Sequence, residues 1–207
     1  LGSEISALQG VYERYNFIFL ERTDLDISCR VDLELFLSNR HIDAIINCAA
    51  YTNVVKAEME VDVAEATNRK GVLNLAILAK RFSIKLIHIS TDSVFDGEQH
   101  FPYIESDVTN PVNIYSRTKL DGESEMVAVN PKDSIIIRTS WVYSQYGSNF
   151  VKTMLAIGRK KKSIKVVCDQ VGTPTYAKDL ARLILTILPR ISCDEVQVYH
   201  YSNEGAI

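Results

Sequence analysis

The sequence lacks the cysteine and histidine patterns that mark metal sites. Its four cysteines, Cys29, Cys48, Cys168 and Cys193, include no CxxC pair, and two of them end the apolar runs IINC and VVC. The four histidines are equally scattered and show no metal-ligand spacing. We therefore predict no metal site, and we expect the cysteines to be buried free thiols in a reducing compartment.

A strong excess of one charge and a long apolar span are also missing. With 23 Lys and Arg against 26 Asp and Glu, the chain has no electrostatic footprint for nucleic acid or for an anionic membrane. Its one basic run, residues 159–162, follows Gly158 and is typical of a solvated helix end. No signal peptide and no apolar segment of membrane length is visible, so we expect a cytoplasmic protein.

What the chain does contain is a regular alternation of apolar runs and helical patterns over 207 residues, with 46% hydrophobic residues for a core. Runs of continuous hydrophobicity predict strands covered on both faces, at 16–20, 43–48, 85–90, 134–138, 164–168 and 196–200. Helical patterns lie between them, at 32–40, 63–82, after Pro111, 149–160 and 177–188. This alternation predicts an α/β fold with a doubly wound parallel sheet, as one domain over residues 1–207.

Small and polar residues follow three of the predicted strands. They are Ala49 and Ala50, then Ser90, Thr91 and Asp92, then Thr139, Ser140 and Trp141. Each group has a structural alternative, because two alanines can allow tight packing, Ser-Thr-Asp can cap a helix, and a lone tryptophan can be a core residue. Since ligands bind beyond the carboxyl ends of parallel strands, the three groups together predict a ligand site at that edge.

The stretch NPVNIYSRTKLDGE adds a tyrosine and a lysine at helical spacing. Tyr115 and Lys119 are four residues apart and would point the same way from a helix. Asn110 is expected to cap that helix, with Pro111 in its first turn. The pair alone predicts little, because a tyrosine packed under the stem of a surface lysine has the same spacing.

Taken in order, the segments NCAAYT, STDSVFDG, YSRTK, RTSWVYSQYGSNFVKTML and DQVGTPTYAKDLA resemble the extended short-chain dehydrogenase/reductase family. Within it they look most like the dTDP-4-dehydrorhamnose reductases, from the first residues to about residue 203. The resemblance implies a Rossmann-like fold and NAD(P)H-dependent reduction of a 4-keto group, from dTDP-4-dehydro-6-deoxy-L-mannose to dTDP-L-rhamnose. Two alternatives stay open: a nucleotide-sugar epimerase or dehydratase of the same superfamily, or a non-catalytic NADP-binding regulatory subunit.

The same resemblance assigns roles to individual residues. It implies a catalytic set of Thr91, Tyr115 and Lys119. Candidate substrate contacts are Asp92, Trp141 and Asn149. The implied cofactor-binding residues are Gly2, Glu21, Arg22, Asp26, Ile27, Ala49, Ala50, Thr52, Ser90, Tyr115 and Lys119.

The chemistry of reduction fits this catalytic set. A tyrosine with an ordinary pKa of about 10 is a poorly matched acid at neutral pH, and a nearby ammonium would lower that pKa. We expect Lys119 to do this, and the Thr91 hydroxyl to hold the carbonyl oxygen near Tyr115. Glu21 suits the ribose of NAD, whereas Arg22 suits a 2′-phosphate. The pair favours NADPH and leaves NADH open.

The chain departs from the family pattern at both ends. The family opens with a strand and a Gly-x-x-Gly-x-x-Gly turn, of which only Gly2 has a counterpart here, and Val55 stands where an aspartate is expected. We therefore expect the first strand and most of the C-terminal substrate lobe to be absent, with residues from about 139 to 207 contacting that lobe. The expected partner is a small-molecule nucleotide sugar, with no nucleic acid and no membrane, and the hypothesis allows a homodimer.

Overall fold

The chain divides into two units. The structure, a computed structural model, describes residues 1–167 and 169–207. The larger unit comprises Leu20–Arg138 and Arg190–His200, and the smaller unit comprises Leu1–Phe19, Thr139–Pro189 and Tyr201–Ile207. Within the described residues, no helix has the length and apolar character needed to cross a membrane.

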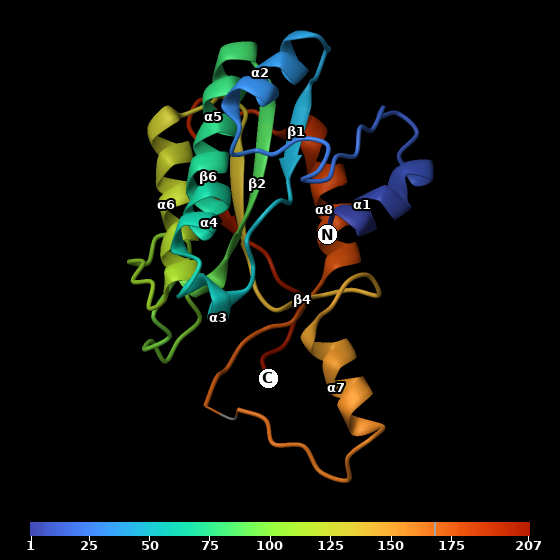
Figure 1. The fold of residues 1–207 in the computed structure, drawn as a ribbon, viewed down its shortest axis with the longest axis vertical. Coiled ribbons are helices and arrows are strands. Elements are labelled where there is room, and N and C mark those ends of the chain that lie inside the picture. Colours follow the sequence, from blue (N-terminus) through green and yellow to red (C-terminus); the bar gives the residue numbers. More distant parts are fainter. Residues whose placement is uncertain (168) are drawn as a thin grey trace. The chain divides into compact units, whose positions relative to one another are not determined.

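A four-stranded sheet forms the centre of the larger unit (Figure 1). Its order is β1 (Ala44–Asn47), β2 (Lys85–Thr91), β3 (Ile135–Thr139) and β6 (Gln197–His200). Strand β1 runs parallel to β2, and β3 runs parallel to β6. The strands predicted at 43–48, 85–90, 134–138 and 196–200 are therefore confirmed, and so is a Rossmann-like parallel sheet with helices.

Three helices share one apolar core with this sheet. They are α2 (Arg30–Ser38), α5 (Gly71–Phe82) and α6 (Ile114–Val129), and α5 and α6 run side by side in Figure 1. The buried core takes side chains from all three helices and from β2 and β3, including Leu33, Leu75, Leu78, Met126, Leu86 and Ile136. Burial of these side chains, each contributing roughly 1.5–3 kcal/mol, fixes α6 against β2 and β3.

The helix predicted over 63–82 is interrupted by a wider turn. It consists of α4 (Val61–Glu65), a π-helical turn at Ala66–Lys70 and then α5. Here α6 approaches so closely that a Cβ atom on Gly122 would collide with the Asn68 carbonyl oxygen. Such turns carry an inserted residue and are frequent at functional sites, so Asn68 is a candidate site residue.

Among its described residues, the smaller unit contains three α-helices and a two-stranded ladder. These are α1 (Gly2–Leu8), α7 (Phe150–Gly158), α8 (Ala177–Ile187), β4 (Val142–Tyr143) and β5 (Thr175–Tyr176). Helix α1 packs on α8, whose apolar face is buried, and β4 pairs in parallel with β5. Short 3-10 turns occur in the chain at Gln9–Val11, Asp92–Val94 and Leu188–Arg190.

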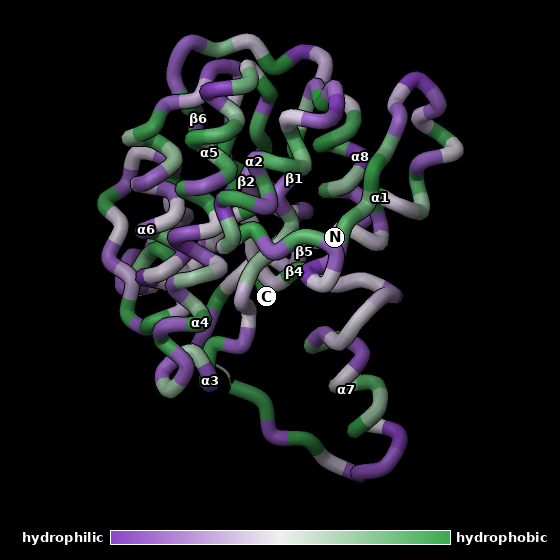
Figure 2. Tube along the Cα trace, turned by 45° about the horizontal axis from the view of Figure 1, so that its top comes forward, coloured by the Kyte–Doolittle hydropathy of each residue, from purple (hydrophilic) through white to green (hydrophobic). Residues whose placement is uncertain are grey.

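Two of the predicted strands are wrong. Residues 16–20 and 164–167 form no strand, and residue 168 lies outside the described residues. Phe17 and Phe19 stack on each other at 5.5 Å between ring centroids, while Ile18 is 49% exposed. Residues 164–167 appear in Figure 2 as green tube broken by one purple residue, and Val167 is 66% exposed. Both runs have strand-like composition, but neither pairs with a neighbouring strand.

The cysteines in the described residues are free, but they are less buried than expected. Cys29, Cys48 and Cys193 are each partly exposed, and Cys168 lies outside the described residues. Cys29 occupies the N-cap position of α2, and Cys48 follows the last residue of β1. These are ends of elements, where packing is looser than inside a strand, so the prediction of buried thiols is wrong as stated, although the partly exposed Cys48 still lies in desolvating surroundings that raise the pKa of its thiol to about 11.

Candidate active site

Strand β2 carries Ser90, Thr91 and Asp92 to the carboxyl edge of the sheet. The Thr91 hydroxyl oxygen accepts a hydrogen bond from the Ser93 backbone N–H at 3.2 Å and donates one to Asp92 Oδ1 at 3.3 Å. Thr91 therefore caps the turn Asp92–Val94, which is the structural alternative foreseen for this motif. Ser90 Oγ is buried and finds no hydrogen-bond partner among the described residues, so it remains available to a ligand.

Helix α6 begins later than the sequence suggested. Its N-cap is Asn113, whose side-chain oxygen accepts a hydrogen bond from the Ser116 N–H at 2.9 Å. Asn110 instead donates from its side chain to Asp96 Oδ2 at 3.0 Å, and Pro111 precedes the helix. The prediction of Asn110 as the cap is wrong, because the second asparagine of NPVN satisfies the free N–H groups of the first turn.

Tyr115 lies in the first turn of α6, partly buried beside Thr91 and Asp92. Burial raises the pKa of the Tyr115 phenol, the Asp92 carboxylate raises it further, and the Thr91 hydroxyl acts in the opposite direction. Burial also raises the pKa of Asp92. The expectation that Lys119 lowers the pKa of Tyr115 is therefore wrong for this structure. Tyr115 is a protonated phenol at neutral pH, which is the form that a proton donor needs.

Lys119 is not a surface lysine lying over a tyrosine. Its side chain is 2% exposed, and Nζ donates a hydrogen bond to the Ile89 carbonyl oxygen at 2.6 Å. Nζ also lies 3.3 Å from His88 Nε2. Burial lowers the pKa of Lys119 to about 8, which Glu123 and Cys48 partly oppose. A buried amine with this pKa is unusual for structure alone and common at functional sites.

Two polar residues that the sequence analysis missed connect Lys119 to β1. His88 is fully buried, and its Nδ1 lies 3.1 Å from Asn47 Nδ2. Asn47 Oδ1 in turn accepts a hydrogen bond from the Ala49 backbone N–H at 3.1 Å. The available signal was a polar residue inside each of two apolar strands. Only the register of β1 and β2, which places Asn47 opposite His88, shows that these two polar residues contact each other.

The loop after β1 is held by the π-helical turn. Asn68 Oδ1 accepts from the Tyr51 N–H at 2.8 Å, while Asn68 Nδ2 donates to the Tyr51 carbonyl oxygen and to Thr118 Oγ1, each at 3.1 Å. This loop includes the predicted cofactor residues Ala49, Ala50 and Thr52, of which Ala49 and Thr52 are exposed. It leads into α3 (Val54–Ala57), which Asn53 caps.

The residues predicted for the adenine end form a local turn. Asp26 Oδ1 accepts from the backbone N–H and the hydroxyl of Ser28, at 2.9 and 2.8 Å, and these bonds lower the pKa of Asp26. Arg22 Nε donates to Asp26 Oδ2 at 3.1 Å, yet the Arg22 side chain stays 63% exposed. Glu21 is exposed, whereas Ile27 packs against the core. Arg22 is therefore tethered at one nitrogen and open at the others.

A buried ion pair fixes α6 to the end of β3. Arg138 donates from Nε to both oxygens of Glu123, at 3.1 Å each, and from Nη2 to Glu123 Oε2 at 2.7 Å. The two side chains are 7% and 4% exposed. Since Glu123 lies one helical turn after Lys119, this pair sets the position of the helix that carries Tyr115 and Lys119.

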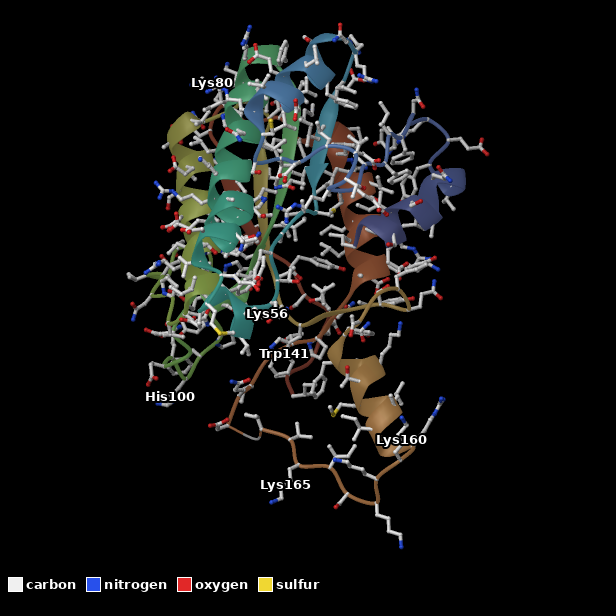
Figure 3. The ribbon with its side chains drawn as sticks, viewed as in Figure 1. Lys56, Lys80, His100, Trp141, Lys160 and Lys165 are labelled. Atoms are coloured by element: carbon white, nitrogen blue, oxygen red, sulfur yellow. The ribbon has the colours of Figure 1, made fainter. Side chains whose placement is uncertain are left out.

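Three of the predicted site residues belong to the smaller unit. Gly2 opens α1, and nothing near it in the described residues requires a glycine. Trp141, labelled in Figure 3, has a positive φ of 44°, is 42% exposed and packs its ring against Gly172. Asn149 caps α7, because its Oδ1 accepts from the Lys152 N–H at 3.1 Å. Trp141 is therefore not a core residue, and Asn149 has a clear structural part.

Comparisons with known proteins cover nearly the whole chain. The model of a family described as RmlD substrate binding domain matches residues 1–207. A dTDP-4-dehydrorhamnose reductase from Aggregatibacter actinomycetemcomitans is 38% identical over 210 residues, covering 100% of this chain and 71% of the relative. One from Sinorhizobium fredii is 43% identical over 190 residues, covering 90% of this chain and 64% of the relative.

A solved structure shows the same fold. The dTDP-4-dehydrorhamnose reductase of Bacillus anthracis, crystallised in complex with NADP, superposes with a TM-score of 0.89 at 36% identity, covering 99% of this chain and 71% of that chain. This chain thus spans about two thirds of the length of the relatives that it matches. From the family model, the identities and the fold together, the chain belongs to the dTDP-4-dehydrorhamnose reductase family.

Proposed function

We propose that the chain carries the cofactor-binding and catalytic part of an NADPH-dependent reductase. The reaction is reduction of the 4-keto group of dTDP-4-dehydro-6-deoxy-L-mannose, which gives dTDP-L-rhamnose. The shared name of the two relatives supports this substrate. Within the molecule the proposal rests on one observation: Thr91 and Asp92, from the end of β2, lie beside Tyr115, one helical turn before the buried Lys119.

The residues along the carboxyl edge of the sheet fit a nicotinamide dinucleotide. Ala49 and Ala50 present no bulky side chain where a flat ring or a backbone must approach, and the buried Ser90 hydroxyl lacks a partner among the described residues. Arg22 keeps most of its guanidinium exposed beside Asp26 and could accept a 2′-phosphate. The NADP complex of the Bacillus anthracis relative supports NADPH over NADH.

The catalytic residues divide the work of ketone reduction. A bound nicotinamide cofactor supplies the hydride to carbon 4 of the sugar. Tyr115 donates its phenolic proton to the carbonyl oxygen, so that the ketone becomes a secondary alcohol and Tyr115 a phenolate. Thr91 orients the same oxygen through its hydroxyl. Lys119 lies one helical turn after Tyr115, and its hydrogen bond to the Ile89 carbonyl oxygen holds it at the end of β2 beside the proposed cofactor edge.

The decisive experiment measures NADPH oxidation by the purified protein with dTDP-4-dehydro-6-deoxy-L-mannose. Tyr115→Phe should lower kcat by about 10²-fold or more and leave NADPH affinity nearly unchanged, because the hydroxyl acts mainly in the transition state. Tyr12→Phe is the matched control, since the Tyr12 hydroxyl contacts only Arg182 and Thr186 of α8 among the described residues. A Tyr115→Phe variant with wild-type kcat would assign the proton to another group.

A double mutant tests whether Thr91 and Tyr115 act on one oxygen. If they do, Thr91→Val combined with Tyr115→Phe should be little slower than Tyr115→Phe alone. Multiplicative rate losses that follow falling thermal stability would instead make both residues structural. An epimerase or dehydratase would behave differently from the start: it would retain tightly bound NAD and would not consume added NADPH.

A further inference from the structure

Three buried side chains form a continuous chain of polar contacts across the sheet. It runs from the Ala49 backbone through Asn47 and His88 to Lys119, and ends at the Ile89 carbonyl oxygen. Asn47, His88 and Lys119 are 4%, 0% and 2% exposed, so water does not compete for these contacts. Each polar atom in this series of contacts must therefore face a donor if it accepts and an acceptor if it donates. Otherwise it loses a hydrogen bond in an apolar interior.

The backbone determines the orientation of the Asn47 amide. Ala49 N–H can only donate, so the Asn47 atom 3.1 Å from it must be the oxygen. The amide nitrogen of Asn47 then faces His88 Nδ1 at 3.1 Å and donates to it. Since Nδ1 accepts, a neutral His88 carries its proton on Nε2. Burial and the nearby Lys119 hold the pKa of His88 well below its ordinary value, which keeps the ring neutral.

This tautomer has a consequence for Lys119. An Nε2–H donor would face Nζ at 3.3 Å, and an ammonium has only donors to offer in return. An uncharged amine satisfies both contacts, because its lone pair accepts from Nε2–H while one N–H donates to the Ile89 carbonyl oxygen. The imidazole therefore favours the uncharged form of Lys119, in addition to the effect of burial.

We propose that His88 is a positioning residue that holds Lys119 against the Ile89 carbonyl and favours its uncharged form through an Nε2–H donor. Its effect on turnover rests on the proposed function, whereas its tautomer and its effect on Lys119 do not. His88 would thereby join the loop after β1 to the lysine of α6. Lys119 then gains or loses its proton near pH 8, whereas a lysine with an ordinary pKa stays charged there.

Other groups also act on Lys119 and must be kept constant. Glu123, one turn further along α6, favours the ammonium, but it is already paired with Arg138. Cys48, after β1, acts in the same direction, and burial raises its own pKa to about 11. Both residues are left unchanged in the variants below, so a change in Lys119 can be attributed to position 88.

The first measurement is the tautomer of His88 in the wild-type protein, read from the imidazole ¹⁵N chemical shifts. His88→Gln assigns the signal by removing it, and His41→Gln is the matched control because the His41 side chain is 90% exposed. The expected result is a protonated Nε2 and an unprotonated Nδ1. A protonated Nδ1 would overturn the proposal, because Nε2 would then accept from an ammonium.

The second measurement is the NMR titration of the Lys119 ε-methylene group. His88→Gln can turn its amide oxygen toward Nζ, and His88→Asn keeps a partner for Asn47 while removing the group that reaches Lys119. Each variant should raise the pKa of Lys119 by about one unit and move the basic limb of kcat against pH by the same amount. Thermal melting checks that both variants are folded.

The outcomes separate this inference from the proposed function. If Lys119 titrates in a folded variant as it does in the wild type, His88 is a structural residue and the proposal fails. If the wild-type protein shows no NADPH turnover, the proposed function fails, while the tautomer and the titration still decide the role of His88. If neither variant folds, the His88 signal of the wild type is assigned by replacing the other three histidines in turn, and its tautomer alone decides.

Discussion

Helices α6 and α7 begin in the same way and differ in what they bury. Asn113 and Asn149 each accept a hydrogen bond from the backbone N–H three residues later, at 2.9 and 3.1 Å. Helix α7 is strongly apolar, with Phe150 and Leu155 both 60% exposed and no buried residue. Helix α6 has little net apolar character, yet it buries six residues, most of them polar: Ser116, Thr118, Lys119, Gly122, Glu123 and Met126.

The contrast shows that the burial of a helical side chain in these two helices depends more on whether a hydrogen-bond or ion-pair partner is present than on the hydropathy of the helix. Lys119 and Glu123 are buried because β2 offers the Ile89 carbonyl oxygen to the lysine and β3 carries Arg138, which pairs with the glutamate. Buried charges are tolerated when they are paired and hydrogen-bonded, and they are then costly to disturb. The polar face of α6 should therefore matter more to stability than the apolar face of α7.

The largest effect is expected from Glu123→Ala. Removing this carboxylate leaves Arg138 buried without its partner, which should lower the free energy of unfolding by about 3–5 kcal/mol. Urea denaturation measures the loss. Glu125→Ala is the matched control on the same helix, because Glu125 pairs with Arg69 at 2.9 Å in a more exposed position, and surface pairs contribute at most about 1 kcal/mol. Equal losses in the two variants would contradict the importance of the buried pair.

Lys119→Met should change how stability depends on pH. The pKa of Lys119 is about 8 in the folded protein against an ordinary 10.5, so between these values the unfolded chain holds a proton that the folded protein has released. Stability of the wild type therefore rises with pH through this window, by about 3 kcal/mol, and the full penalty applies below pH 8. Lys119→Met should lack this rise and be catalytically impaired.

Urea denaturation of both proteins at several pH values measures this difference. Lys160→Met, which removes an exposed lysine after α7, controls for the loss of one charge. A wild type and a Lys119→Met variant with parallel pH profiles would show that Lys119 keeps an ordinary proton affinity in the folded state.

The fold could be predicted where local pattern and long-range pairing agree. The runs at 43–48 and 85–90 became β1 and β2 because each found a parallel neighbour. The runs at 16–20 and 164–167 have the same composition without a neighbour, and they form no strand. The composition of a segment indicates its tendency to be extended, whereas its hydrogen bonding into a sheet depends on a partner strand far away in the sequence.

The candidate site shows the same difference between features that a local pattern predicts and features that depend on distant residues. Thr91, Tyr115 and Lys119 could be predicted as site residues from the sequence, because the ends of strands, the spacing of a helix and the family motifs are local features. His88 was missed because its meaning depends on Asn47, 41 residues away, through the register of two strands. The pKa of Tyr115 was predicted in the wrong direction, since spacing gave the distance to Lys119 along the helix but not the burial of either group.

A smaller effect is expected from replacing the asparagine that caps each of the two helices. Asn113→Ala and Asn149→Ala should each lower the free energy of unfolding by about 1 kcal/mol through loss of the cap. Asn149→Ala should cost more than Asn113→Ala, because Asn149 Nδ2 also donates to the Ser144 carbonyl oxygen at 2.6 Å. The Asn→Asp variants keep the capping oxygen, so only Asn149→Asp should be clearly destabilising. Equal losses for both asparagines would show that the bond to Ser144 contributes little.

The smallest effect is expected on the exposed face of α7. Leu155→Gln replaces one good helix former by another at a side chain that is 60% exposed, so stability of the 207-residue chain should change by no more than about 0.5 kcal/mol. Met126→Ala, at a fully buried position of α6, is the opposite case and should cost about 2–5 kcal/mol. Thermal and urea unfolding of both variants measures the difference. A loss of more than about 1 kcal/mol for Leu155→Gln would mean that α7 buries this leucine in solution. The two helices would then differ in the hydrogen-bond partners of their buried side chains, and no longer in whether they bury side chains.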